Sequence, residues 1–177
     1  MNKRSFLKVL VGAAVVPTVA VSAYQTLLAD RNTSSTTDVT VTLTEDKQVE
    51  KIELSRAEWK KKLTPAQYRV LRKAGTERPY SSPLNNEKRD GVFACAGCEL
   101  PLFESETKFE SGTGWPSFFQ PLSGHVATST DFKLIFPRTE YHCARCGGHQ
   151  GHVFKDGPRP TGLRYCNNGV ALTFVPA

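Results

Sequence analysis

Apolar and polar residues alternate in short runs over the second half of the chain. After Gly91 these runs are rich in valine, phenylalanine, tyrosine and threonine, and glycine and proline separate them. That composition and length are typical of β-strands rather than helices. The pattern predicts strands over residues 91–95, 133–136, 139–143, 152–155 and 170–175. We therefore expect a compact, mainly β domain, mostly antiparallel, in this part of the chain.

The segment before these strands has the marks of one or two small helices. Residues 55–58 and 64–67 both have capping-box spacing, a serine or threonine followed three positions later by glutamate or glutamine. Pro65 occupies the favoured first helical position. The pattern predicts a helix over 65–74, ended by Gly75 in the left-handed conformation.

The first 29 residues have the pattern of an export signal. Residues 3–8 carry positive charges, 9–23 form an apolar stretch of mostly small side chains, and Val21-Ser22-Ala23 fits a cleavage site. Residues 3–8 resemble a twin-arginine signal with lysine in place of the first arginine, so the general secretory route remains open. We expect an exported, periplasmic protein. The alternative is a retained N-terminal membrane anchor, against which Pro17 and the shortness of the apolar run both count.

The net charge falls by half once the signal is set aside. The formal net charge of +6 includes Lys3, Arg4 and Lys8 of the signal, which leaves +3 for the remainder. This balance gives no reason to expect nucleic acid or a stable membrane partner. Residues 30–54 begin with a polar Ser/Thr-rich tract and are expected to form a linker. Residues 55–177 are expected to form one domain, long enough to hold a core.

The chain has five cysteines, and four of them form two Cys-x-x-Cys pairs, Cys95 with Cys98 and Cys143 with Cys146. Two such turns can supply four thiolates to one tetrahedral ion, which leaves no open coordination position. The pairs therefore predict one structural zinc, although iron could occupy the same ligands. Two disulfides or two redox-active pairs are the alternatives, because an exported protein meets an oxidising environment. No organic cofactor is expected.

Cys166 is the remaining thiol and the candidate nucleophile. The nearby Arg164 would stabilise a thiolate, the reactive form, although a lone cysteine is often a buried, inert side chain. His149 and His152 are better explained as proton donors or acceptors than as extra ligands, because four thiolates already saturate a zinc ion. Trp115 lies in a loop between glycine and proline, which favours an exposed binding face over a core position.

Several of these segments, in this order, resemble the B class of peptide methionine sulfoxide reductases. The resemblance covers about residues 55–174, and its motifs are 95–98, 101–103, 111–118, 143–146, 149–154, 156–158, 161–162 and 164–168. It implies a fold of two antiparallel sheets with a structural zinc in members that carry both cysteine pairs. It also implies reduction of the R epimer of methionine sulfoxide, free or in oxidised proteins and peptides.

The resemblance implies a role for each candidate residue. Cys166 would attack the sulfoxide sulfur and become a sulfenic acid, a state that a thiol can reduce. Arg164 would favour its thiolate. The sulfoxide oxygen would be oriented and protonated by three side chains, His149, His152 and Asn168. The substrate would be bound by Trp115, Phe118 and Asp156, with the Trp115 ring against the methyl group and Asp156 also bracing Arg164.

Three positions depart from the family pattern. Thr113 stands where many members carry a resolving cysteine, so the sulfenic acid should be reduced by an external thiol or a thioredoxin-like partner. Gln150 replaces the usual leucine and Gly169 a usual serine, and both are expected to adjust the pocket.

Two other functions remain open at this point. A zinc-stapled β module that binds a partner and catalyses nothing would keep the cysteine pairs, but it would not require Trp115, the two histidines and Cys166. A disulfide oxidoreductase would use its Cys-x-x-Cys pairs as redox groups and hold no metal.

Overall fold

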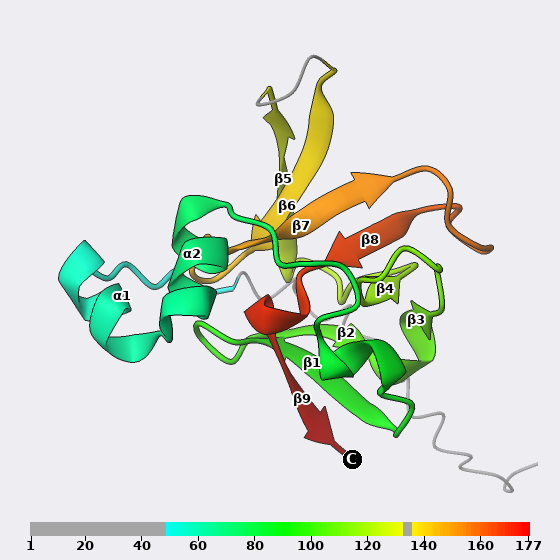
Figure 1. Ribbon diagram of the computed structural model, residues 1–177, viewed down its shortest axis with the longest axis horizontal. Coiled ribbons are helices and arrows are strands. Elements are labelled where there is room, and N and C mark those ends of the chain that lie inside the picture. Colours follow the sequence, from blue (N-terminus) through cyan, green and yellow to red (C-terminus); the bar gives the residue numbers. More distant parts are fainter. Residues whose placement is uncertain (1–48, 133–135) are drawn as a thin grey trace, which may run out of the picture. The chain divides into compact units, whose positions relative to one another are not determined.

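The computed structural model describes residues 49–132 and 136–177 (Figure 1). The predicted export signal, most of the predicted linker and residues 133–135 of a predicted strand lie outside the described residues. Within the described ranges, no helix is both long and apolar enough to cross a membrane.

In the described part of the chain, two short α-helices precede the sheets, as the capping pattern predicts. They are α1, Arg56–Lys62, and α2, Pro65–Lys73. Both capping boxes are formed: the Ser55 and Thr64 hydroxyls accept from the backbone N–H three residues on, at 3.3 and 3.2 Å. These bonds satisfy donors that a helix start otherwise leaves unpaired.

The end of α2 differs from the prediction by one residue. Ala74, not Gly75, takes the left-handed conformation, with φ of 47°. Gly75 instead donates its backbone N–H to the Arg69 carbonyl at 3.0 Å, and a Cβ at Gly75 would lie 3.0 Å from that oxygen. The glycine is therefore explained by this close approach rather than by a positive φ.

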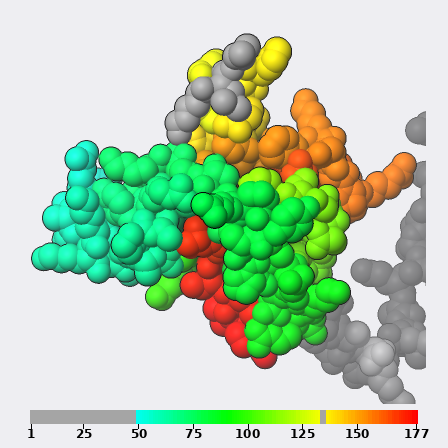
Figure 2. Space-filling model, in the orientation of Figure 1, coloured from blue at the N-terminus to red at the C-terminus, as the bar shows by residue number. Residues whose placement is uncertain are grey.

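Over residues 49–132 and 136–177, nine strands form two antiparallel sheets, which confirms the predicted fold class. The smaller sheet has the order β2-β1-β9, and the larger one β3-β4-β8-β7-β6-β5. The strands are β1 Gly91–Cys95, β2 Pro101–Glu104, β3 Lys108–Phe109, β4 Ser117–Phe118, β5 Val126–Asp131, β6 Arg138–Cys143, β7 His149–Phe154, β8 Arg164–Asn167 and β9 Leu172–Pro176. In Figure 1 the hairpin of β5 and β6 extends away from the smaller sheet, and Figure 2 shows it standing out from the surface in yellow.

Four of the five predicted strands agree with the structure except at their ends, whereas Phe136, the one described residue of the predicted strand 133–136, lies between β5 and β6. Strand 91–95 is confirmed, and 139–143 falls within β6. Strand β7 begins earlier than the predicted 152–155, at His149. The predicted 170–175 begins instead as a short 3₁₀ helix, η3 Gly169–Ala171, before β9. A helical turn was missed here because Val170 and Ala171 continue the apolar run of the strand.

The core lies between the two sheets and is built of aromatic rings. The Phe103 and Phe118 rings stack with centroids 4.1 Å apart, and Phe93 meets Phe118 edge-on at 4.9 Å. Phe93, Phe103, Phe118 and Tyr141 are fully buried. Each such side chain contributes about 1.5–3 kcal/mol through burial. The aromatic core therefore covers one face of the larger sheet and not the other.

Packing against this core starts before the predicted domain boundary at Ser55. Val49 contacts the core, and the Ile52 N–H donates to the Arg145 carbonyl at 2.8 Å. The Lys51 ammonium donates to the Ala144 carbonyl, also at 2.8 Å. The end of the predicted linker is thus attached beside the second cysteine pair.

Candidate active site and metal centre

The four paired cysteines meet at one buried point. Cys95 ends β1 and Cys143 ends β6, while Cys98 and Cys146 lie in the turns that follow, so remote parts of the chain are joined there. All four sulfur atoms lie within 4.8 Å of one another, with Cys95–Cys146 at 3.7 Å and Cys98–Cys143 at 3.4 Å. No pair is joined by a disulfide.

The spacing of these sulfurs fits a tetrahedral metal ion. Zinc–thiolate bonds of about 2.3 Å give a tetrahedron with sulfur–sulfur edges of about 3.8 Å. Two polar side chains donate toward the cluster: Gln150 Nε2 to Cys95 Sγ at 3.3 Å, and Arg72 Nη2 to Cys146 Sγ at 3.5 Å. Such donors are what thiolate ligands require. The four cysteines therefore form a site that fits zinc in a structural role.

Cys166 lies in the middle of the larger sheet, on β8. Its direct cross-strand partners are Ser117 on β4 and His152 on β7. Directly opposed residues project from the same face, so Cys166, His152 and, one strand further, Glu140 share a face. Neighbouring Asn167 projects to the other face, where it is fully buried. The candidate chemistry therefore lies on the side of the sheet away from the aromatic core.

A cavity of about 210 Å³ opens over this thiol. Its lining is formed by Thr76, Trp115, Arg138, Gly151, His152, Phe154, Cys166, Asn167 and Asn168. Four predicted site residues thus meet around one space: Cys166, His152, Asn168 and Trp115. The remaining predicted residues, His149, Arg164, Asp156 and Phe118, are not in this lining.

Gly151 lets strands β7 and β8 approach closely beneath the cavity. A Cβ at Gly151 would lie 1.8 Å from the backbone oxygen of Cys166. Any larger residue would push β8 away and displace the thiol, so glycine is required here.

Asn168 and Trp115 are held by the same upstream residue, Glu77. The Glu77 N–H donates to Asn168 Oδ1 at 2.9 Å, and its carbonyl accepts from Trp115 Nε1 at 3.3 Å. The Glu77 carboxylate accepts from the N–H groups of Gly169 and Val170, at 2.5 and 2.9 Å. One residue thereby orders the tryptophan, the asparagine and the turn that follows Cys166.

His152 belongs to a network of polar contacts at the base of the β5–β6 hairpin. Its Nε2 lies 2.8 Å from Asp131 Oδ2, and Arg138 Nη2 donates to the same oxygen at 2.7 Å. Asp131 is buried, and Arg138 reaches the cavity wall. The Asp131 carboxylate therefore fixes the His152 ring and holds the Arg138 guanidinium beside the cavity.

His149 lies behind His152 rather than in the cavity. The ring centroids are 5.5 Å apart, and His149 Nδ1 lies 2.6 Å from Glu140 Oε1. His149 is buried. This geometry suits a group that supports His152 and neighbouring charges more than one that contacts the substrate.

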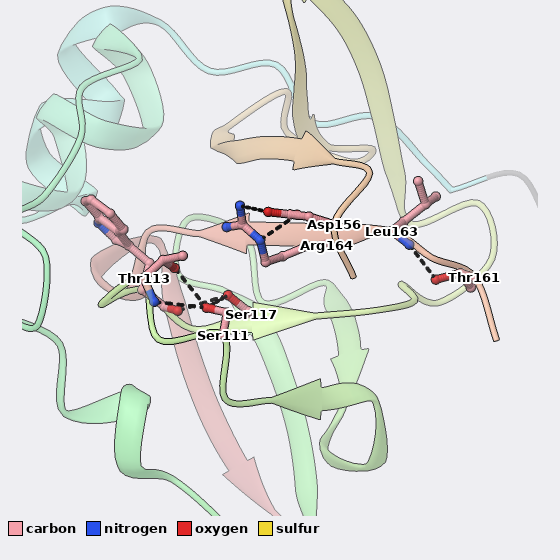
Figure 3. A network of polar contacts seen from close by, with 8 residues as sticks. Ser111, Thr113, Ser117, Asp156, Thr161, Leu163 and Arg164 are labelled. Carbon is pink, nitrogen blue, oxygen red and sulfur yellow. Dashed lines mark hydrogen bonds and ion pairs between the residues drawn. The ribbon is translucent and has the colours of Figure 1, made fainter. Parts of the chain in front are cut away.

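The surroundings of the Cys166 sulfur act in opposite directions on the pKa of the thiol. Burial raises the pKa of the thiol above its ordinary value and outweighs the lowering by the Arg164 guanidinium and by a hydrogen bond from Thr113. Arg164 is itself engaged: its Nε and Nη2 donate to the two oxygens of Asp156, both at 2.9 Å (Figure 3). Arg164 therefore lowers the pKa of the Cys166 thiol, as predicted, but by less than burial raises it.

A chain of hydroxyl groups leads from β4 to the thiol. Ser111 Oγ lies 2.7 Å from Ser117 Oγ and 2.8 Å from Thr113 Oγ1 (Figure 3). Thr113 is also one of the groups that lower the pKa of the Cys166 thiol. Linked hydrogen bonds of this kind polarise one another, so Thr113 presents an oriented group to the sulfur.

Phe118 was predicted to contact substrate, but the structure places it elsewhere. Its side chain is fully buried against Phe103 and Phe93, on the core side of β4. Asp156 bonds to Arg164 outside the cavity lining. Both residues support the site through its neighbours.

The residues that sequence reasoning missed contact the site from distant elements. Glu77, Asp131 and Arg138 belong to no recognisable local motif, and of the three only Asp131 and Arg138 lie at the end of a strand. Gln150 and Gly169 were expected to adjust the pocket, but both are buried outside its lining. Gly169 faces Ser82: a Cβ there would lie 2.0 Å from Ser82 Oγ, which explains the absence of a side chain.

Comparison with known proteins gives consistent matches. Residues 63–176 match the SelR domain. The chain is 56% identical over 120 residues to peptide methionine sulfoxide reductase B1, chloroplastic, of Arabidopsis thaliana, covering 67% of this chain and 59% of that protein. It is 52% identical over 127 residues to the peptide methionine sulfoxide reductase MsrB of Agrobacterium fabrum, covering 71% and 94%. Identity to the protein of the same name from Methanosarcina barkeri is 56% over 124 residues, covering 70% and 87%.

Proposed function

The chain belongs to the SelR family, and from this premise we propose that it is a peptide methionine sulfoxide reductase that reduces methionine-R-sulfoxide to methionine at Cys166. The observation that carries the proposal is the cavity in which Cys166, His152, Asn168 and Trp115 meet. A binding module would have no use for a thiol at the floor of such a cavity.

The reaction transfers one oxygen atom from substrate sulfur to enzyme sulfur. Cys166 Sγ attacks the sulfoxide sulfur, the sulfur–oxygen bond breaks, and the products are methionine and a sulfenic acid on Cys166. The substrate sulfur gains two electrons and Cys166 loses two. The thiol proton and the transferred oxygen together form the sulfenic hydroxyl, so atoms and charge balance.

The lining residues suit the separate demands of this step. His152, held by Asp131, can pass a proton to the sulfoxide oxygen as the bond breaks. Asn168 Nδ2 donates one hydrogen to the Gln150 carbonyl, at 2.9 Å. Its second hydrogen is the one that can orient the sulfoxide oxygen. The Trp115 ring offers an apolar face to the substrate methyl group. Each role follows from the position of the group relative to the thiol.

A thiol from outside the chain completes the cycle. The first thiol attacks the sulfenic acid and releases water, and the second reduces the mixed disulfide and returns Cys166 to the thiol. The other four cysteines are buried in the metal centre, and Thr113 stands beside Cys166 in place of a second thiol. A small thiol or a thioredoxin-like protein is the reductant we propose.

The metal ion, when bound, crosslinks the loops after β1 and β6 and takes no part in the chemistry, because four thiolates leave it no open position. Cys95, Cys98, Cys143 and Cys146 would hold it.

We also propose export, most simply to the periplasm, with cleavage after Ala23. Supporting this are the charged run at 3–8 and the apolar run at 9–23. Oxidised exported proteins would then be the substrates. Cell fractionation of the full chain and of a chain starting at residue 30 tests this: both in the cytoplasm would contradict it.

The decisive test uses separated epimers of a peptide methionine sulfoxide. The zinc-loaded protein with dithiothreitol should release methionine from the R epimer only, and Cys166→Ser should release none while keeping its fold and metal. Turnover by the serine variant would contradict the assignment of the nucleophile. No turnover by the zinc-loaded, reduced wild type would favour the non-catalytic zinc-stapled module.

A further inference from the structure

We propose that Gln150 is a positioning residue that couples the four-cysteine metal centre to the catalytic strand. It lies on β7 with a fully buried side chain. A buried amide is costly unless its donors and acceptor are satisfied. The hydrogen-bond partners of this amide offset the cost of burying it. One partner belongs to the metal centre and the other to the catalytic strand.

The first partner is a metal ligand. Gln150 Nε2 donates to Cys95 Sγ at 3.3 Å. A metal-bound thiolate can only accept hydrogen bonds, so the amide nitrogen, not the oxygen, must face the sulfur. Donors of this kind stabilise thiolate ligands and orient them around the ion.

The second partner lies beside the nucleophile. Gln150 Oε1 accepts from Asn167 Nδ2 at 3.4 Å. Asn167 Nδ2 also donates to the Asn168 carbonyl at 2.8 Å, and its Oδ1 accepts from the Tyr141 hydroxyl at 2.6 Å. Because the carbonyl of Asn168 can only accept, the orientation of the Asn167 amide is fixed, and with it that of Gln150.

The main chain of Gln150 supplies a second connection. Its carbonyl accepts both the backbone N–H and the side-chain Nδ2 of Asn168, each at 2.9 Å. Asn168 lines the cavity, and Asn167 directly follows Cys166. A path of hydrogen bonds therefore runs from Cys95 through Gln150 to the two asparagines beside the thiol.

The orientations of the Gln150 and Asn167 amides both agree with a thiolate acceptor at Cys95. A change in the metal–sulfur geometry must move the Gln150 amide or break its bond to sulfur, and either change is passed to Asn167. The metal centre thus positions the catalytic strand in addition to stapling the loops. This inference concerns the metal centre and does not depend on the proposed reaction.

Arg72 provides a matched control. It donates to a different ligand, Cys146, through Nη2 to Sγ at 3.5 Å, and through both terminal nitrogens to the Cys146 carbonyl, at 3.0 and 2.9 Å. Arg72 comes from α2, and its hydrogen bonds go to Cys146 rather than to Asn167 or Asn168. Removing Arg72 should weaken the metal centre without interrupting the path.

The experiment changes the metal and observes the asparagines. Cadmium replaces zinc on the same four thiolates with longer metal–sulfur bonds, and the side-chain amide resonances of Asn167 and Asn168 are recorded in the ¹⁵N-labelled chain. In the wild type and in Arg72→Met, the exchange should shift both resonances. In Gln150→Met, which keeps the length of the side chain but not its amide, the shifts should be lost.

A second measurement covers the case in which the methionine variant folds poorly. Gln150→Glu keeps an acceptor toward Asn167 but places an oxygen toward Cys95, and it should release zinc to a competing chelator about 10-fold to 100-fold more readily. Shifts that persist in the Gln150 variants, or that are absent in the wild type, would overturn the coupling. Unchanged zinc release in Gln150→Glu would do the same.

Discussion

Arg164 and Cys166 lie two positions apart on β8, so the guanidinium and the thiol project from the same face of the sheet. The guanidinium is paired with Asp156, and burial of the sulfur has the larger effect. The result is a nucleophile whose pKa lies above the ordinary value. Cys166 should therefore be mainly protonated at neutral pH before substrate binds.

The rate of alkylation of Cys166 by iodoacetamide should consequently rise with pH through an inflection above that of a thiol in an unfolded peptide. Arg164→Met should move the inflection further upward because the guanidinium lowers the pKa, and Asp156→Asn should move it downward because the carboxylate raises it. The same shift affects folding stability. Because the pKa of the Cys166 thiol is higher in the folded protein than in the unfolded chain, its contribution to stability is fully present below the unfolded pKa and is lost as the pH rises through the folded pKa. An inflection at or below that of the peptide thiol would contradict the account.

Cys95→Ala should release the metal and lower the melting temperature by about 10 °C or more, since binding to a structural site contributes directly to folding. Thermal unfolding with metal analysis checks this. Cys166→Ser is the control, because it removes a thiol that is not a ligand and should retain both metal and melting temperature. A Cys95 variant with unchanged melting temperature would argue against a structural metal.

Thr113→Cys should allow a disulfide with Cys166 after one turnover with methionine sulfoxide. The Thr113 side chain is near enough to the sulfur to lower the pKa of the Cys166 thiol, and a cysteine sulfenic acid condenses readily with a nearby thiol. Intact mass would show a loss of 2 Da relative to the reduced variant, about the mass of two hydrogens. A sulfenic acid that persists unchanged in this variant would mean that the loop is held too far from β8.

Glu77→Ala should lower kcat/KM about 10-fold to 100-fold, because displaced groups near reacting atoms are costly. The substitution leaves the Gly169 and Val170 N–H groups without their acceptor and loosens the segment that holds Trp115 and Asn168.

Two further variants separate positioning by Glu77 from general destabilisation. Glu77→Asp should restore part of the activity, whereas Glu58→Gln, at the distant cap of α1, should change nothing. Trp115 fluorescence, recorded with Trp59→Phe, should report a more mobile ring in Glu77→Ala alone. Equal kinetics in the wild type and Glu77→Ala would contradict the positioning role.

The elements of the fold were accessible to sequence reasoning where local chemistry decides them. Capping boxes at Ser55 and Thr64 and the strand at 91–95 depend on neighbours in the chain and were predicted. The 3₁₀ turn at Gly169–Ala171 was not, because its cap is Glu77, more than 90 positions away. Tertiary partners of this kind leave no local pattern.

The candidate site divides in the same way. Cys166, His152, Asn168 and Trp115 lie in recognisable segments and meet in the cavity. Phe118 belongs to the same segment as Trp115, yet the alternation of β4 turns it toward the core. Sequence alone did not fix which face of the strand each residue occupies, and that face decides its role.

The sulfur spacing in the metal centre has a consequence for how the protein matures. Cys98 and Cys143 lie 3.4 Å apart, while a disulfide needs about 2.05 Å, so a small relaxation would let an oxidant join them before an ion arrives. Metal and oxidant thus compete for the newly folded chain. If the protein is delivered to an oxidising compartment, it would keep these four thiols available as ligands only when its metal binds before an oxidant reaches them.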